Sequence, residues 1–264
     1  MTSANSPKPS WQDFDAETAI PDAERREEWA AYQAEELKKA PSERWRPAEG
    51  SKLARDLYGK HAGDLFFVIG CGPSIKRAEN YLALPQPGVI RIAVNRAILK
   101  IPAEYCIFID LDAYQAVKDH PNAKNAVLLG VDRFAKLYGP EVHVWERAFT
   151  LPDLRAGRIV HRSTTLIAAL HMATWLGSTR TVTVGCENSM KKLGPWQVDD
   201  TLSQKVNRFT YARINKSLMT DTPFWLPRWC TLADASIDGQ LPLPKTTINK
   251  ELEMKRGCIV SNSN

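Results

Sequence analysis

The apolar residues of this chain gather in short continuous runs instead of alternating with polar residues. Six such runs lie at residues 64–70, 88–95, 104–112, 125–132, 141–146 and 180–187. Strands that are buried on both faces have this pattern, which is typical of parallel sheets. A helix-like segment follows the first run, and the apolar segment 164–177 predicts a helix before the last run. Strands that alternate with helices indicate an α/β fold with a Rossmann-like, mostly parallel, doubly wound sheet.

The two ends of the chain lack this alternation. Residues 1–20 are polar and predict a loose tail, while 21–40 is rich in helix-forming residues, with acidic residues early and lysines late. A second short helix is expected near 51–59. Beyond the last run, residues 188–264 carry many tryptophans, prolines and polar residues, which predict some helix near 200–218 and a lid or cap of loops elsewhere.

The composition indicates a cytoplasmic globular protein without a membrane partner. No apolar run approaches the ~20 residues of a membrane helix, and the N-terminus lacks the basic and apolar regions of a secretory signal. The five cysteines are scattered without a CxxC pair, which predicts reduced thiols.

The charge is unevenly distributed along the chain. Residues 1–60 carry a net charge of −2, and residues 61–264 carry +7. The excess of cations favours an anionic ligand. A nucleic-acid partner is a weaker alternative, because the chain has no long basic block and no zinc finger. A basic surface without such a ligand is the third interpretation.

The first apolar run ends in the turn Gly-Cys-Gly-Pro-Ser. Gly70 and Gly72 permit a sharp turn and a close approach of a ligand to the backbone, and Pro73 suits the first turn of the next helix. The N–H groups at a helix start favour phosphate, so we predict that these residues and Ser74 bind a nucleotide. The motif is not a complete G-x-G-x-x-G, since Ile75 stands at the third glycine position. A tight turn without a ligand is the alternative.

Polar side chains end the second and third runs. Asn95 either hydrogen-bonds a base or ribose or caps the following helix. Asp110 and Asp112 form a pair that could chelate a divalent cation such as Mg²⁺. We favour Asp110 as a hydrogen-bonding group near a ribose or an acceptor.

Hydroxyl groups precede the apolar helix. Ser163, Thr164 and Thr165 either cap this helix or form a second small anion site. His161 is either a general base or an ordinary loop histidine. His171, among apolar neighbours in the helix, is expected in the core.

Glu187 and Asn188 end the last run. The carboxyl ends of parallel strands meet at one edge of the sheet, where ligands bind in doubly wound folds. The predicted site groups therefore converge there. Three tryptophans beyond this edge either stack on a sugar or base or fill a small core: Trp196, Trp225 and Trp229.

Two motifs carry a resemblance to a known family. The segment VIGCGPSIKRAENYLALPQPGVIRIAVNRAI resembles the opening of bacterial lipooligosaccharide-type sialyltransferases, and of related phage and bacterial proteins grouped with archaeal 6-hydroxymethylpterin diphosphokinases. The segment STTLIAALHMATWLGSTRTVTVGCENS is similar to their second signature, in which a hydroxyl turn and an alanine-rich helix precede a strand ending in G-x-[DE]. The matching motifs cover roughly residues 61–190.

The resemblance implies that the turn binds a nucleotide, which in the sialyltransferases carries a sialic acid on cytidine monophosphate. Gly72, Pro73 and Ser74 would contact the phosphate, Asn95 the nucleotide, and the hydroxyls at 163–165 the donor. The chain departs from the sialyltransferases because no histidine follows His171, and the aspartate of their strand is a glutamate here. A base would then be one of four carboxylates, unless transfer needs none: Asp110, Glu187, Asp199 or Asp200.

The favoured hypothesis is a transferase with a nucleotide-sugar donor, a glycosyltransferase that has no tightly bound cofactor. Its acceptor would be a glycan, a small metabolite or a modified base of phage-type DNA. The alternatives are an ATP- and Mg²⁺-dependent diphosphokinase, with Asp110 and Asp112 as a metal clamp, and a nucleotide-binding protein without catalysis. The expected organisation is an N-terminal extension (1–60), a nucleotide-binding core (61–187) and a C-terminal lid with a tail (188–264).

Overall fold

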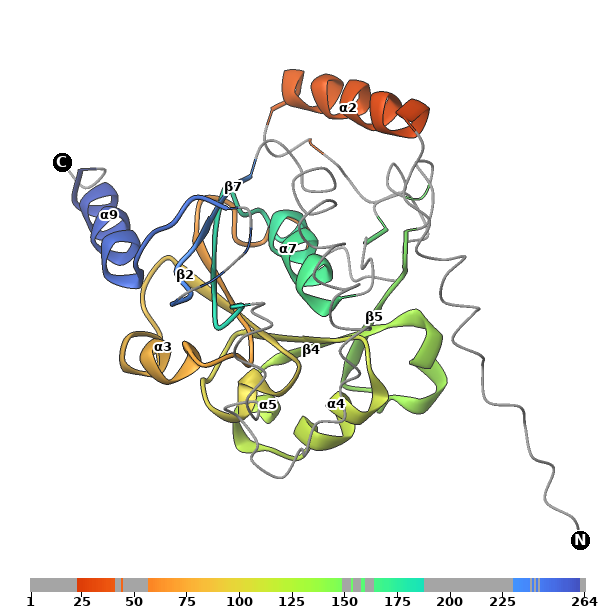
Figure 1. The fold of residues 1–264 in the computed structure, drawn as a ribbon. Coiled ribbons are helices and arrows are strands. Elements are labelled where there is room, and N and C mark those ends of the chain that lie inside the picture. Colours follow the sequence, from red (N-terminus) through yellow and green to blue (C-terminus); the bar gives the residue numbers. More distant parts are fainter. Residues whose placement is uncertain are drawn as a thin grey trace, which may run out of the picture.

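A seven-stranded sheet forms the centre of the protein, and helices pack alongside it (Figure 1). The computed structural model describes residues 23–40, 44, 57–148, 153, 158–159, 164–187, 230–237, 239, 241 and 243–261. All neighbouring strands pair in parallel, in the order β5-β4-β3-β2-β1-β6-β7. The predicted α/β, Rossmann-like sheet is therefore confirmed.

Six of the seven strands coincide with the apolar runs of the sequence. The strands are β1 (Leu65–Ile69), β2 (Val89–Val94), β3 (Tyr105–Phe108), β4 (Val127–Val131), β5 (Val142–Trp145), β6 (Arg180–Val184) and β7 (Thr231–Asp234). Every residue of β1, β2 and β3 is buried, because both faces of the central sheet are covered. The third run is shorter as a strand than predicted, since a helix begins at Leu111.

The order of the strands creates a switch point between β1 and β6. From β1 the chain moves outward through β2, β3 and β4 to β5, then returns to place β6 on the other side of β1. Leu65 consequently pairs with Val89 on one side and with Arg180 on the other. In doubly wound sheets the crevice beyond the carboxyl ends of two such strands is the usual ligand site.

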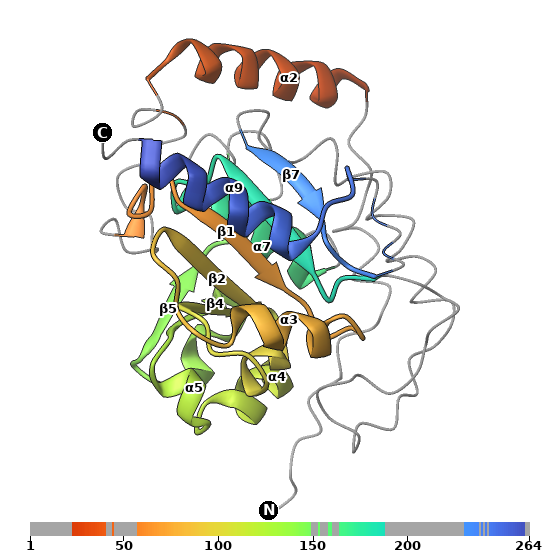
Figure 2. The same ribbon diagram turned by 90° about the vertical axis from the view of Figure 1, so that its left-hand side faces the viewer.

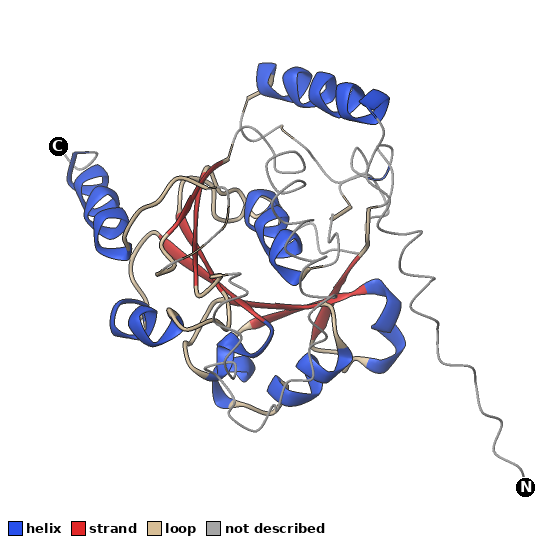
Figure 3. Cartoon of the chain, viewed as in Figure 1, coloured by secondary structure: helices blue, strands red, loops and turns tan. Residues whose placement is uncertain are grey.

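Helices cover both faces of the sheet. Figure 3 shows α7 on one side of the strands and α3, α4 and α5 on the other. The helices are α2 (Ala23–Lys38), α3 (Ile75–Leu82), α4 (Leu111–Val117), α5 (Pro121–Lys124), α7 (Thr165–Trp175) and α9 (Ile248–Ser261), with 3-10 helices η3 (Asn95–Leu99) and η4 (Asp132–Leu137). Each face carries its own apolar core, and α7 is buried along its whole length. His171 lies fully buried in this helix, as predicted.

The C-terminal part of the chain adds to the sheet. Residues 231–234 form β7, which pairs with β6, and α9 lies beside α3 (Figure 2). The prediction of loops was wrong for these residues. Glu251 of α9 is buried and accepts hydrogen bonds from Arg180 of β6 (2.6 and 3.1 Å), which anchors the helix to the sheet.

The N-terminal helix is confirmed as α2, in which Trp29 is buried. The predicted tail at 1–20 and the helix near 200–218 lie outside the described residues, as does most of the short helix near 51–59. Within the part of the chain that the structure describes, no helix has the length and apolar character to cross a bilayer.

Candidate functional site

The turn between β1 and α3 packs against the end of β6. The N–H of Gly70 donates to the carbonyl of Val184 (2.8 Å), and that of Gly72 donates to the carbonyl of Gly185 (2.8 Å). A Cβ on Gly70 would collide with Gly185, and a Cβ on Gly72 would collide with the carboxylate of Glu187. Both glycines are therefore required by contact with the protein's own chain, whatever ligand binds nearby.

Ser74 and Glu187 meet at the start of α3. The backbone N–H of Ser74 donates to Glu187 Oε1 (2.6 Å), and the Ser74 hydroxyl oxygen accepts from the N–H of Ile237 (2.6 Å). The Glu187 side chain is buried, and its Oε2 has no hydrogen-bond partner among the described residues. A carboxylate thus occupies the helix start that the sequence predicted for a phosphate, while Pro73 remains exposed.

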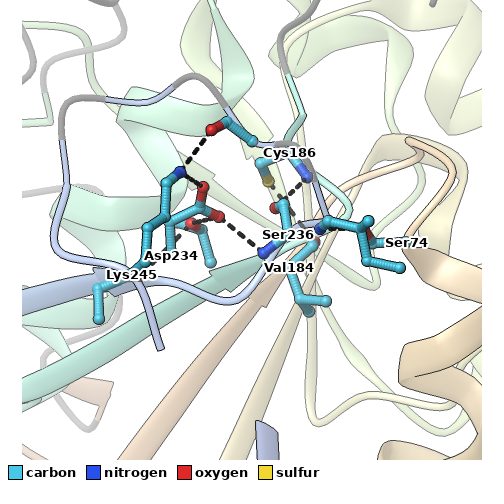
Figure 4. A network of polar contacts seen from close by, with 10 residues as sticks. Ser74, Val184, Cys186, Asp234, Ser236 and Lys245 are labelled. Carbon is cyan, nitrogen blue, oxygen red and sulfur yellow. Dashed lines mark hydrogen bonds and ion pairs between the residues drawn. The ribbon is translucent and has the colours of Figure 1, made fainter. Parts of the chain in front are cut away.

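A buried polar network holds the segment after β7 across this turn (Figure 4). Asp234 has no exposed surface and accepts from the Thr183 hydroxyl (2.8 Å), the Ser236 N–H (3.0 Å) and Lys245 Nζ (2.6 Å). The Ser236 hydroxyl oxygen in turn accepts from the N–H of Cys186 (3.0 Å). Sequence reasoning missed these residues, because Thr-Leu-Ala-Asp at 231–234 is not a continuous apolar run of the kind that precedes Asp110.

Asn95 follows β2 at the same edge of the sheet. Its φ of 54° lies in the left-handed region, and no other non-glycine residue in the described part of the chain has a positive φ. Its Nδ2 donates to the hydroxyl oxygen of Thr165 (3.4 Å), whereas its buried Oδ1 has no partner among the described residues. Thr164 caps α7 by accepting from the N–H of Leu166 (3.0 Å), which agrees with the capping alternative. Its predicted contact with a donor nucleotide stays a prediction.

Arg96 follows Asn95 and lies close to Cys71 of the turn, and sequence reasoning did not select it. Its Nε is buried without a hydrogen-bond partner among the described residues. Burial raises the pKa of the neighbouring Cys71 thiol to about 12, although the N–H groups of Arg96 and Ala97 and the Arg96 charge oppose this rise. A raised pKa leaves little of the nucleophilic thiolate at neutral pH, and Arg96 offers a cation at the carboxyl edge.

Asp110 follows β3 and faces Arg133. Arg133 Nη2 lies 3.4 Å from Asp110 Oδ1 and donates to the carbonyl of Ile109 (2.8 Å). Desolvation by the surrounding protein raises the pKa of Asp110, and the Arg133 charge opposes this rise while the Asp112 charge adds to it. The Asp110 side chain is nevertheless 60% exposed, so an acceptor can reach it.

The acidic pair does not belong to a larger cluster of metal ligands. Asp112 is exposed in the first turn of α4, and Asp110 pairs with an arginine. Among the described residues, no group of three or more histidine, cysteine, aspartate or glutamate side chains could hold a metal ion.

Comparisons with protein-family models, curated proteins and solved structures gave no match. The resemblance to the sialyltransferases and pterin diphosphokinases therefore stays a prediction.

The structure brings together part of the predicted site. Ser74 meets Glu187, and Asn95 meets Thr165, at the carboxyl ends of β1, β2 and β6. Asp110 lies at the end of the adjacent strand β3. The remaining predicted groups lie outside the described residues: His161, Ser163, Asn188, Trp196, Asp199, Asp200, Trp225 and Trp229.

Proposed function

We propose that the protein is a transferase that binds a nucleotide-activated donor at the carboxyl edge of its sheet, in its most specific form a glycosyltransferase. The observation that carries the proposal is Asn95. A strained backbone persists where function requires it, and a buried amide oxygen without a partner calls for a donor from a ligand. Both features, the missing partner being judged among the described residues, occur at the end of β2, one strand from the switch point where doubly wound sheets bind nucleotides.

The neighbouring groups supply the remaining roles. Asn95 Oδ1 accepts from an N–H or O–H of the base or ribose, and the Arg96 guanidinium neutralises a phosphate of the donor. Asp110 takes the proton of the acceptor hydroxyl, whose oxygen forms the new bond to the sugar. The bond between sugar and phosphate breaks, and its electron pair leaves with the nucleotide.

The pairing of Asp110 with Arg133 favours this function over a magnesium-dependent diphosphokinase. The Arg133 guanidinium lies 3.4 Å from the Asp110 carboxylate and would repel a metal ion that bound to the same group. We therefore expect turnover of a nucleotide sugar to persist in EDTA. Release of AMP from ATP that requires Mg²⁺ would instead support the diphosphokinase.

Nucleotide binding can be tested with variants of Asn95 and Arg96. Thermal shifts would be measured with CMP, UDP, GDP and ATP, since a ligand at 100 times its Kd stabilises a protein by ~2.7 kcal/mol. Asn95→Gly removes the carboxamide and suits a positive φ, so the variant should fold well and lose the shift. Arg96→Met should also lose it. The matched control is Arg77→Met, which removes an exposed arginine from α3.

Two results would overturn the proposal. One is a wild-type protein that gives no shift with any of the four nucleotides and releases no nucleotide from their sugar conjugates. The other is nucleotide binding that Asn95→Gly and Arg96→Met leave unchanged.

A further inference from the structure

The start of α3 already holds an anion, the carboxylate of Glu187. Helix starts favour negative charge because their N–H groups lack acceptors within the helix. Here the N–H of Ser74 donates to Glu187 Oε1 (2.6 Å), and the N–H of Gly72 donates to Gly185 (2.8 Å). The N–H of Ile75 bonds within the turn, to the carbonyl of Gly72 (3.0 Å). A phosphate can gain the Ser74 N–H only if the carboxylate leaves it.

The carboxylate is itself incompletely satisfied. Glu187 is 4% exposed, and its Oε2 lies against Gly72 without a hydrogen-bond partner among the described residues. A buried charged oxygen without a partner is costly. The penalty at Oε2 offsets part of the hydrogen bond from the Ser74 N–H and so lowers the cost of moving the carboxylate out.

We infer that Glu187 is an internal competitor of the ligand's phosphate. Its carboxylate closes the anion site at α3 in the empty protein and withdraws when a nucleotide phosphate binds to the Ser74 N–H. This inference rests on the proposed function, because the incoming anion is the phosphate of the same nucleotide. A site that is open in only a fraction of the molecules binds more weakly by that fraction. Glu187 therefore lowers the affinity for phosphate. If Glu187 were instead a general base, or contacted another part of the ligand, it would not lower this affinity.

The test is a titration of the purified full chain with pyrophosphate, followed by isothermal calorimetry at fixed ionic strength. Glu187→Ala removes the competing carboxylate and should bind pyrophosphate at least about tenfold more tightly than the wild type. Glu187→Gln keeps the shape and an acceptor oxygen but loses the charge, and should show a smaller gain. The control is Glu79→Ala, which removes an exposed carboxylate from the same helix and should change the affinity little.

The outcomes separate this inference from the proposed function. Equal or weaker pyrophosphate binding by Glu187→Ala, with the variant folded by circular dichroism, overturns the internal competitor. The internal competitor is also overturned if neither the wild type nor any variant binds pyrophosphate, while the wild type binds a nucleotide and Asn95→Gly does not. If Glu187→Ala does not fold, an unchanged affinity in Glu187→Gln overturns it. The absence of binding by any form to any nucleotide or to pyrophosphate overturns both proposals.

Discussion

Replacing Gly72 with alanine should destabilise the whole fold. A Cβ at this position would overlap the Glu187 carboxylate and lie 2.8 Å from the carbonyl oxygen of Gly185, closer than Cβ atoms approach other heavy atoms. If the carboxylate stays, the turn is overpacked at a cost of ~1–3 kcal/mol. If it moves, its charge-assisted hydrogen bond to the Ser74 N–H is lost, at ~1.5–3 kcal/mol. Both routes lead to a loss of about 2 kcal/mol.

The loss can be measured by equilibrium urea unfolding followed by circular dichroism, which yields the free energy of unfolding by linear extrapolation. The control is Gly257→Ala, because Gly257 lies in α9 with no atom within 4 Å of an added Cβ. This control should gain up to ~1 kcal/mol from the better helix propensity of alanine. If Gly72 served only to admit a ligand, the Gly72→Val protein would be as stable as the wild type. We expect it instead to lose more stability than Gly72→Ala.

A double-mutant cycle identifies the contact. Glu187→Ala removes the carboxylate, so Gly72→Ala should cost at least ~1 kcal/mol less in that background, although the contact with Gly185 remains. A Gly72→Ala protein within about 0.5 kcal/mol of the wild type, or costs that simply add, would refute the reasoning.

Two further predictions concern buried carboxylates. Asp234→Ala should lose ~1–3 kcal/mol in urea unfolding, because it removes the buried acceptor of the Thr183 hydroxyl and the Ser236 N–H, whereas Lys245 is half-exposed and keeps its hydrogen bond to the Gly239 carbonyl; a loss below about 0.5 kcal/mol would contradict this. Burial raises the pKa of Glu251, but hydrogen bonds from Arg180 and Thr246 outweigh it and hold the pKa below the ordinary value of a glutamate. The resulting stability is fully present above that ordinary pKa and is lost as the pH falls through the folded-state pKa. Glu251→Gln should therefore be less stable than the wild type at neutral pH, by a margin that shrinks on acidification. A margin that stays constant with pH would exclude this linkage.

The centre of the fold could be predicted from the sequence because its strands are buried on both faces. Such strands appear as continuous apolar runs, and their ends locate the polar residues of the carboxyl edge. β7 gave no such signal, since only two of its four residues, Leu232 and Ala233, are apolar. Its place in the sheet depends on pairing with β6, which no local pattern encodes.

The site was harder to predict than the fold. A glycine-rich turn indicates that something approaches the backbone closely. The turn has the same glycines whether a ligand or another part of the chain makes that approach, so the sequence does not distinguish the two. Here Glu187 makes that approach from 113 positions away along the sequence. The strain at Asn95 and the buried Nε of Arg96 are likewise products of tertiary packing, and neither leaves a mark in the sequence.

The position of β1 between β2 and β6 also affects how the protein folds during synthesis. β2, β3, β4 and β5 follow β1 directly, whereas its other partner, β6, begins only at Arg180. At translation rates of ~5–20 residues per second, one apolar edge of β1 stays without its partner for on the order of ten seconds. An unpaired edge of this kind is a template for aggregation. We therefore expect the yield of the protein in cells to depend on chaperones that shield nascent chains more than on the stability of the finished fold.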